Sequence, residues 1–187
     1  MLEKSLATLF ALLILATLIN RFLVWRLPER KGGEVTLRIR TWWGIVICFS
    51  LVISGPRWMT LTFFALISFL ALKEYCTLIS VHFPRWLYWG IPLNYLLIGF
   101  NCFELFLLFI PLAGFLILAT WRVLVGDPSG FLHTVSAIFC GWIMTVFTLS
   151  HAAWLLMLPT INIQGGALLV LFLLALTESN DIAQYLW

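Results

Sequence analysis

The chain has 187 residues, of which 63% are hydrophobic and 10% are charged, and its formal net charge is +3. Soluble domains carry roughly 25% charged residues, and a soluble fold of this length cannot bury so much apolar surface. The composition therefore excludes a soluble protein. It predicts an all-α polytopic membrane protein with one membrane-embedded domain over residues 1–187. The small net charge gives no reason to expect a nucleic-acid partner.

The N-terminal part predicts three spans and one polar segment. The first span covers about Ser5–Trp25 and is retained, because no small-residue cleavage site follows it. The polar segment Arg26–Thr41 comes next, and its part Val35–Arg40 is expected to lie along the headgroups as a short amphipathic piece. Residues Trp42–Leu72 are interrupted only by Gly55-Pro56-Arg57, which predicts two short spans near the lower length limit, joined by a tight turn.

The C-terminal part predicts a second apolar hairpin and one long span. The hairpin is expected over Trp86–Thr120, broken around Asn101–Glu104, with kinks at Pro92 and Pro111. After a short turn, the long span is predicted over Phe131–Leu158. A polar turn then leads into the last span.

The loop basic residues are distributed unequally between the two sides of the membrane. They gather in segments 26–41, 73–86 and 121–130, whereas the other side carries Lys4 and Arg57. Basic loops tend to stay in the cytoplasm. We therefore expect about seven spans, with the N-terminus outside and the C-terminus at the cytoplasmic face.

The last span starts near Ala167 and carries a polar cluster over Thr177–Trp187. On a continuous helix, Glu178, Asp181 and Tyr185 lie on one face at positions i, i+3 and i+7. Two carboxylates at this spacing repel each other, and a bound cation or a raised pKa on one of them would relieve the conflict. An ionisable residue at membrane depth is a functional hypothesis by default; the alternative is a polar helix end that enters the cytosol.

Two arginines of the first polar segment, Arg38 and Arg40, have two interpretations. In the first, they attract anionic lipid or a phosphate substrate. In the second, they belong to an ordinary positive cytoplasmic loop without a binding role. The four cysteines stand singly without a CxxC pair, so neither structural zinc nor a disulfide framework is expected. The sequence also lacks Gly-x-Ser-x-Gly and His-Glu-x-x-His, which excludes those hydrolase and zinc-protease classes.

The polar cluster resembles a known catalytic signature. Residues Leu174–Trp187 are similar to the start of the signature of the CDP-diacylglycerol synthases (phosphatidate cytidylyltransferases). In that family a hydrophobic helix delivers an Asp that is followed four residues later by a Tyr. Asp181 and Tyr185 match this pair. Asn180 and Gln184 resemble the divergent bacterial branch, in which Asn-Asp precedes Gln-Tyr.

The resemblance implies an enzyme that joins CTP to the membrane lipid phosphatidate, giving CDP-diacylglycerol and pyrophosphate. It implies a multi-pass protein of the bacterial inner (cytoplasmic) membrane. By the resemblance, Asp181 is a catalytic residue and a ligand of Mg²⁺, with Glu178 as a second candidate ligand. Tyr185 is the second catalytic residue that the resemblance implies.

Substrate contacts are expected from Arg38, Arg40, Asn180 and Gln184. The family's later lysine-bearing segments and second Asp are absent from these 187 residues. We therefore expect the chain to be the N-terminal part of a longer catalytic fold and to be inactive by itself. The sequence does not decide whether the protein forms a homo-oligomer. The alternative, from a different class, is a complete small membrane protein without catalysis, such as a transporter subunit or an assembly partner.

Overall fold

Helices make up the regular structure of the described part of the chain. The computed structural model describes residues 2–26, 33–79, 83–125, 130–158 and 163–186. Within these ranges every regular element is a helix, and five helices are long and apolar enough to cross a membrane. The all-α membrane class predicted from the composition is therefore confirmed. The number of spans and their orientation stay predictions.

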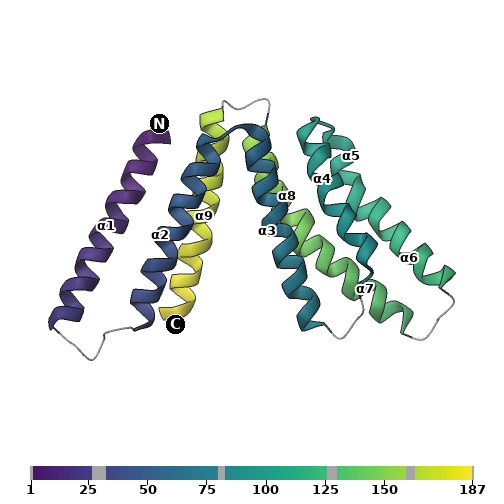
Figure 1. Ribbon diagram of the computed structural model, residues 1–187, viewed down its shortest axis with the longest axis horizontal. Coiled ribbons are helices and arrows are strands. Elements are labelled where there is room, and N and C mark those ends of the chain that lie inside the picture. The colour runs from purple at the N-terminus through teal and green to yellow at the C-terminus, as the bar shows by residue number, and fades with distance from the viewer. Residues whose placement is uncertain (1, 27–32, 80–82, 126–129, 159–162, 187) are drawn as a thin grey trace. The chain divides into compact units, whose positions relative to one another are not determined.

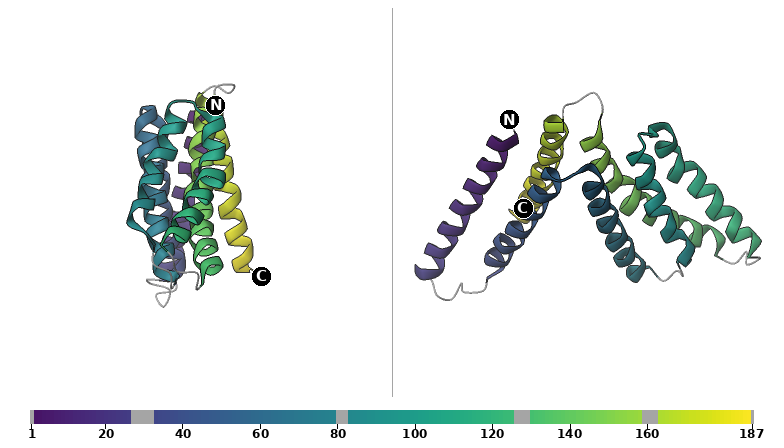
Figure 2. Two further views of the ribbon diagram at one scale, coloured as in Figure 1. Left: turned by 90° about the vertical axis from the view of Figure 1, so that its right-hand side faces the viewer. Right: turned by 45° about the horizontal axis from the view of Figure 1, so that its top comes forward.

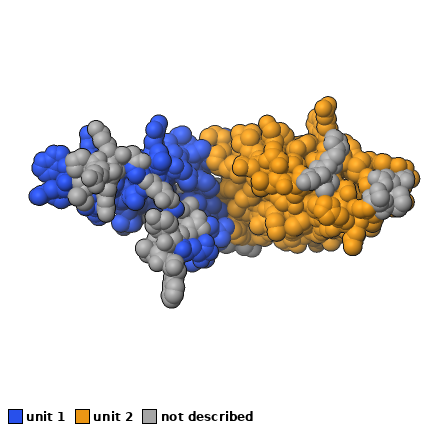
Figure 3. All heavy atoms as spheres, turned by 90° about the horizontal axis from the view of Figure 1, so that it is seen from below, with its two compact units in different colours: residues 1–56, 160–187 blue, residues 57–159 orange. Residues whose placement is uncertain are grey.

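The helices group into two compact units, which Figure 3 shows in different colours. Unit 1 comprises residues 1–56 and 160–187, and unit 2 comprises residues 57–159. Unit 1 contains α1 (Leu2–Arg26), α2 (Glu34–Ser54) and α9 (Ile163–Leu186). In unit 1, α1 packs against both α2 and α9.

Side-chain hydrogen bonds join α1 to α2. Trp43 Nε1 donates to Thr17 Oγ1 at 3.0 Å, and Asn20 Nδ2 donates to Thr36 Oγ1 at 3.1 Å. Lipid supplies no hydrophobic force between helices, so spans are held together by van der Waals packing and by interhelical hydrogen bonds. Each such hydrogen bond contributes about 0.6 kcal/mol. These two bonds therefore help fix the register of α1 against α2.

The separate amphipathic piece predicted over Val35–Arg40 is wrong, because these residues form the first turns of α2. The backbone N–H groups of Thr36 and Leu37 donate to the Gly33 carbonyl at 2.9 and 3.3 Å, which closes the first turn. No proline follows within α2, so the helix continues through the polar residues into the apolar stretch.

The two spans expected over Trp42–Leu72 are longer than predicted. α2 has 21 residues and α3 (Arg57–Leu78) has 22, which is close to the roughly 20 residues that cross a bilayer. α3 includes Lys73 and Glu74, which the sequence pattern assigned to a loop. The physical reason is that hydropathy locates the apolar stretch, whereas a helix ends where its backbone hydrogen bonds end.

Unit 2 combines α3 with one short helical segment and two long ones (Figure 1). The short segment is the 3₁₀ helix η2 (Arg85–Trp89) followed by α4 (Gly90–Gly99). Each long segment has a π-helical middle. They are α5 (Phe103–Leu108), η3 (Phe109–Gly114) and α6 (Phe115–Leu124), then α7 (Phe131–Trp142), η4 (Ile143–Phe147) and α8 (Thr148–Met157). The predicted hairpin and long span are thus confirmed as helices.

The two prolines of the hairpin occupy different environments. Pro111 lies inside the π-helical segment η3, at a position where the sequence predicts a kink. Proline has no backbone N–H to donate, and a π segment is one way in which a helix accommodates such a break. Pro92 lies in the first turn of α4, directly after η2, where a missing N–H leaves no helical hydrogen bond unmade.

A charged side chain closes the turn between α4 and α5. Asn101 adopts the left-handed conformation with φ 59°, which asparagine tolerates better than most residues. Arg57, at the start of α3, donates through Nη2 to the Ile98 carbonyl at 2.8 Å and to Asn101 Oδ1 at 2.6 Å. The positive guanidinium therefore lies at the negative end of the α4 dipole.

We expect Arg57→Met to destabilise unit 2 by about 2 kcal/mol, because charge-assisted hydrogen bonds contribute roughly 1.5–3 kcal/mol. The measurement is the thermal unfolding midpoint of the purified protein in detergent micelles. Arg85→Met is the matched control, because Arg85 is exposed at the start of η2. An equal loss of stability in the two variants would contradict a specific role of the Arg57 contacts.

α3 and α7 approach each other closely at Gly141. The Tyr75 hydroxyl donates to the Ala137 carbonyl at 2.9 Å, which holds its ring across Gly141. A Cβ added at Gly141 would meet Cε1 and Cδ1 of that ring, the latter at 2.6 Å. Glycine at this position therefore permits the close packing of the two helices.

Candidate active site

The polar cluster lies on one uninterrupted helix. α9 runs from Ile163 to Leu186, so the helix predicted to continue through the cluster is confirmed. Its register places positions 178, 181 and 185 on one face. The side chains of these three residues lie outside the described part of the structure. Asn180 and Gln184 are exposed.

The two candidate arginines lie on α2. Arg38 and Arg40 are both exposed, and both lie in the first two turns of that helix. Their place on a helix gives them a fixed position along α2, which the predicted loop would not have provided. Every candidate site residue therefore belongs to α2 or α9, and both helices belong to unit 1.

Helix direction brings the two groups of residues to the same end of unit 1. In Figures 1 and 2, α1 and α9 run in one direction and α2 runs in the opposite direction. The C-terminal ends of α1 and α9 therefore lie at the same end as the N-terminal end of α2. Arg26, at the end of α1, lies over the rings of Phe22 and Trp25 at 5.4 and 5.8 Å from their centroids.

This end of unit 1 has the composition of a membrane interface. Aromatic residues such as Trp25 concentrate at headgroup level, and arginines at such a level attract anionic groups. Arg26, Arg38 and Arg40 belong to the helix ends that lie at the same end of unit 1 as the end of α9. Arginines gathered at such a level are suited to binding phosphates.

The metal prediction stays a prediction. Among the residues whose side chains the structure describes, no group of three or more His, Cys, Asp or Glu could hold a metal ion. Glu178 and Asp181 do not belong to that set. Carboxylate oxygens three residues apart on a helix nevertheless fit Mg²⁺, which takes one or two protein carboxylates and completes its shell with water and substrate phosphates.

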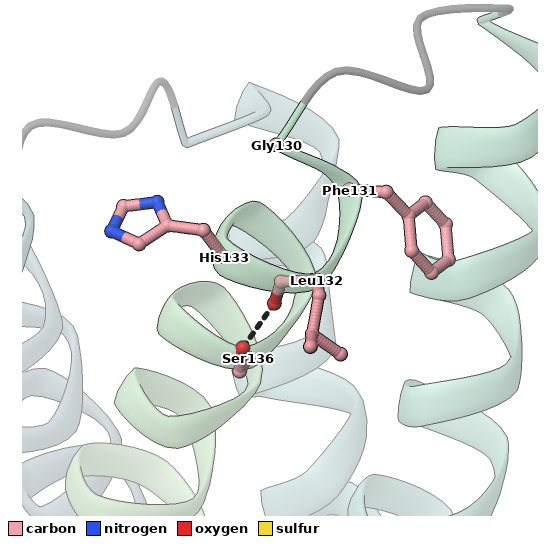
Figure 4. Close-up of a pocket in the computed structure, with 5 residues that line it drawn as sticks. All are labelled: Gly130, Phe131, Leu132, His133 and Ser136. Carbon is pink, nitrogen blue, oxygen red and sulfur yellow. Dashed lines mark hydrogen bonds between the residues drawn. The ribbon is translucent and has the colours of Figure 1, made fainter.

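A shallow hollow lies elsewhere, at the start of α7 in unit 2. It is lined by Gly130, Phe131, Leu132, His133 and Ser136. In Figure 4, Phe131 and His133 point to different sides of the helix, and the Ser136 hydroxyl donates to the Leu132 carbonyl. The hollow has no carboxylate, and none of the candidate site residues lines it. It therefore adds nothing to the candidate site.

The described helices include five that are long and apolar enough to cross a membrane, and the candidate arginines and the end of α9 lie at one end of unit 1. The chain belongs to the cytidylyltransferase family, whose sequence pattern matches residues 36–187. This match confirms the resemblance to the CDP-diacylglycerol synthases, and it takes in both α9 and the arginines of α2.

One curated relative is nearly identical to the chain. The chain is 96% identical over all 187 residues to the protein of Escherichia coli (strain K12) called "Uncharacterized protein YnbB". It spans 63% of the length of that relative. No solved structure matches the chain.

Proposed function

We propose that the chain forms the membrane-embedded part of a phosphatidate cytidylyltransferase. The reaction transfers CMP from CTP to phosphatidate and gives CDP-diacylglycerol and pyrophosphate. The single observation that carries the proposal is the family match over residues 36–187. That range contains every candidate site residue.

The proposed reaction requires two substrates of opposite solubility to meet. CTP is dissolved in the cytosol, whereas phosphatidate cannot leave the bilayer. A site at a helix end, at headgroup depth, is accessible to both. The proposed location is accordingly the cytoplasmic face of the bacterial inner membrane.

The residues of the site divide the chemistry between them. A phosphate oxygen of phosphatidate attacks the α-phosphorus of CTP, the new P–O bond forms, and the bond to pyrophosphate breaks. Arg38 and Arg40 hold the lipid phosphate at the interface by charge-assisted hydrogen bonds. Asn180 and Gln184, exposed on α9, offer amide donors and acceptors to the nucleotide.

The carboxylates of Glu178 and Asp181 would hold Mg²⁺, which neutralises phosphate charge when it is bound. Tyr185 lies one turn beyond Asp181 in the register of α9. Its hydroxyl would donate a hydrogen bond to a substrate phosphate oxygen. The site thus needs α2 and α9 together.

The test uses the extended protein, defined as the full-length E. coli relative carrying this chain's sequence in its matching part. The purified extended protein is mixed with CTP, Mg²⁺ and vesicles that contain phosphatidate. CDP-diacylglycerol and pyrophosphate are expected in equal amounts. Vesicles with phosphatidylglycerol, which has no phosphate monoester, are the substrate control. Absence of product with phosphatidate would overturn the proposed function.

We expect the 187-residue chain alone to give no product above background under the same conditions. Two carboxylates and two arginines supply only part of what is needed to bind a triphosphate and align it. The measurement compares product formation by the chain and by the extended protein at equal concentration in the same vesicles. Metal-dependent product from the chain alone would show that these residues suffice.

A further inference from the structure

Two polar side chains in the core of unit 2 have no hydrogen-bond partner. Asn94, on α4, is fully buried, and neither its Oδ1 nor its Nδ2 is paired. Trp142, at the end of α7, is 3% exposed, and its Nε1 is also unpaired. A buried polar atom without a partner carries the full cost of its desolvation. Such atoms in a lipid-embedded unit require an explanation.

The packing of Trp142 places its N–H next to the face of α4 that carries Asn94. The Cβ position of Gly90 is 2.7 Å from Cζ2 and 3.6 Å from Cε2 of Trp142, and Cε2 is bonded to Nε1. Asn94 follows Gly90 by four residues, so both lie on one face of α4. Helical side chains tilt toward the N-terminus, so the Asn94 side chain extends toward the turn of α4 that carries Gly90 and contacts Trp142.

Both π-helical segments, η3 and η4, adjoin Trp142. The other edge of the Trp142 ring lies against Gly114, the last residue of η3, with Cζ3 at 2.8 Å from the Cβ position. η4 begins at Ile143, directly after Trp142, and η3 and η4 pack against each other. Trp142 thus lies where α4 meets η3 and where η4 begins. π segments often occur at binding sites.

We propose that Asn94 and Trp142 bind a buried water molecule between α4 and α7. The water accepts a hydrogen bond from Trp142 Nε1–H and donates one to Asn94 Oδ1, and Asn94 Nδ2 offers a further donor nearby. A buried water typically makes about three such bonds. Within the described residues no acidic or basic side chain is buried, so the site suits a small neutral molecule and not an ion.

The test observes the Trp142 indole proton directly. The protein is labelled with ¹⁵N at its tryptophan indoles and studied by NMR in detergent micelles, and Trp142→Phe assigns the signal. We expect a cross-peak between Trp142 Hε1 and long-lived water, which Asn94→Leu removes and Asn94→Ser retains. The control is Trp43, whose Nε1 donates to Thr17 and should give no such peak. Absence of the Trp142 peak in the unsubstituted protein would overturn the proposal.

Thermal unfolding gives a second, independent readout. Asn94→Leu and Trp142→Phe should each lower the unfolding midpoint by about 4 °C, because each leaves the water and its remaining partner unsatisfied. The double variant should lose less than the sum, since the water is lost only once. If the site is dry, Asn94→Leu removes two unpaired atoms and raises the midpoint, which would reject the bound water.

Discussion

Asp181→Asn in the extended protein is expected to reduce Mg²⁺-dependent release of pyrophosphate from CTP to background. The substitution keeps the shape of the side chain and removes the negative charge that a hard divalent cation requires. The position lies on α9 within the stretch that matches the cytidylyltransferase family. Expression and membrane insertion should not change, because one neutral polar group replaces a charged one of equal size.

A variant of the neighbouring acidic residue, Glu178, distinguishes a metal-ligand role of Asp181 from a general effect of negative charge. Glu178→Gln should reduce the rate by only about tenfold, because Asp181 and not Glu178 matches the family signature. Glu104→Gln is the matched control, since Glu104 is exposed in the first turn of α5 in unit 2. Full activity of Asp181→Asn would remove the metal-ligand assignment. Loss of the protein from the membrane would instead indicate a structural role.

Gly141→Ala is expected to destabilise unit 2 by about 1–2 kcal/mol, the difference between an overpacking cost and a gain in helix propensity. Overpacking a filled core costs typically 1–3 kcal/mol, and here the added Cβ meets the Tyr75 ring, whose hydroxyl is bound to the Ala137 carbonyl. The gain in helix propensity from glycine to alanine, about 1 kcal/mol, offsets only part of that cost. The measurement is equilibrium unfolding in mixed micelles with increasing denaturing detergent.

The control for propensity is Gly44→Ala in the middle of α2. A Cβ at Gly44 meets nothing within 4 Å, so this change should be neutral or slightly stabilising. The control for the clash is the double variant Gly141→Ala with Tyr75→Ala, in which the added methyl group has room. If Gly141→Ala is equally harmful without the Tyr75 ring, the close contact is not the cause.

The sequence predicted the helices well because lipid constrains the chain strongly. In lipid each backbone polar group needs an internal partner, so apolar runs form helices. Within the described ranges, hydropathy therefore located the helical segments, including the two on either side of Asn101. It placed the start of α2 and the end of α3 incorrectly, because Arg38, Arg40 and Lys73 are polar residues that remain inside their helices.

The candidate site itself stays a prediction, and the packed core of unit 2 could not be predicted from the sequence. The family likeness around Asp181 and the spacing to Tyr185 were visible in a single segment. Helix packing is not visible in a single segment of sequence. The burial of Asn94, for example, depends on neighbours far away in the sequence. The presence of Asn94 within the apolar run of the hairpin could have indicated that its side chain is buried, since polar residues at membrane depth face the protein interior.

Unit 1 is assembled from both ends of the sequence, with residues 57–159 between its parts. During synthesis, α1 and α2 enter the membrane early, and the whole of unit 2 must be translated before α9 emerges. At 5–20 residues per second this interval lasts roughly 5 to 20 s. For that time the surface of α1 that later contacts α9 is covered by lipid or by the insertion machinery. Arrival of α9 thus completes unit 1, and a ribosome that stalls before residue 163 leaves α1 without its contact to α9.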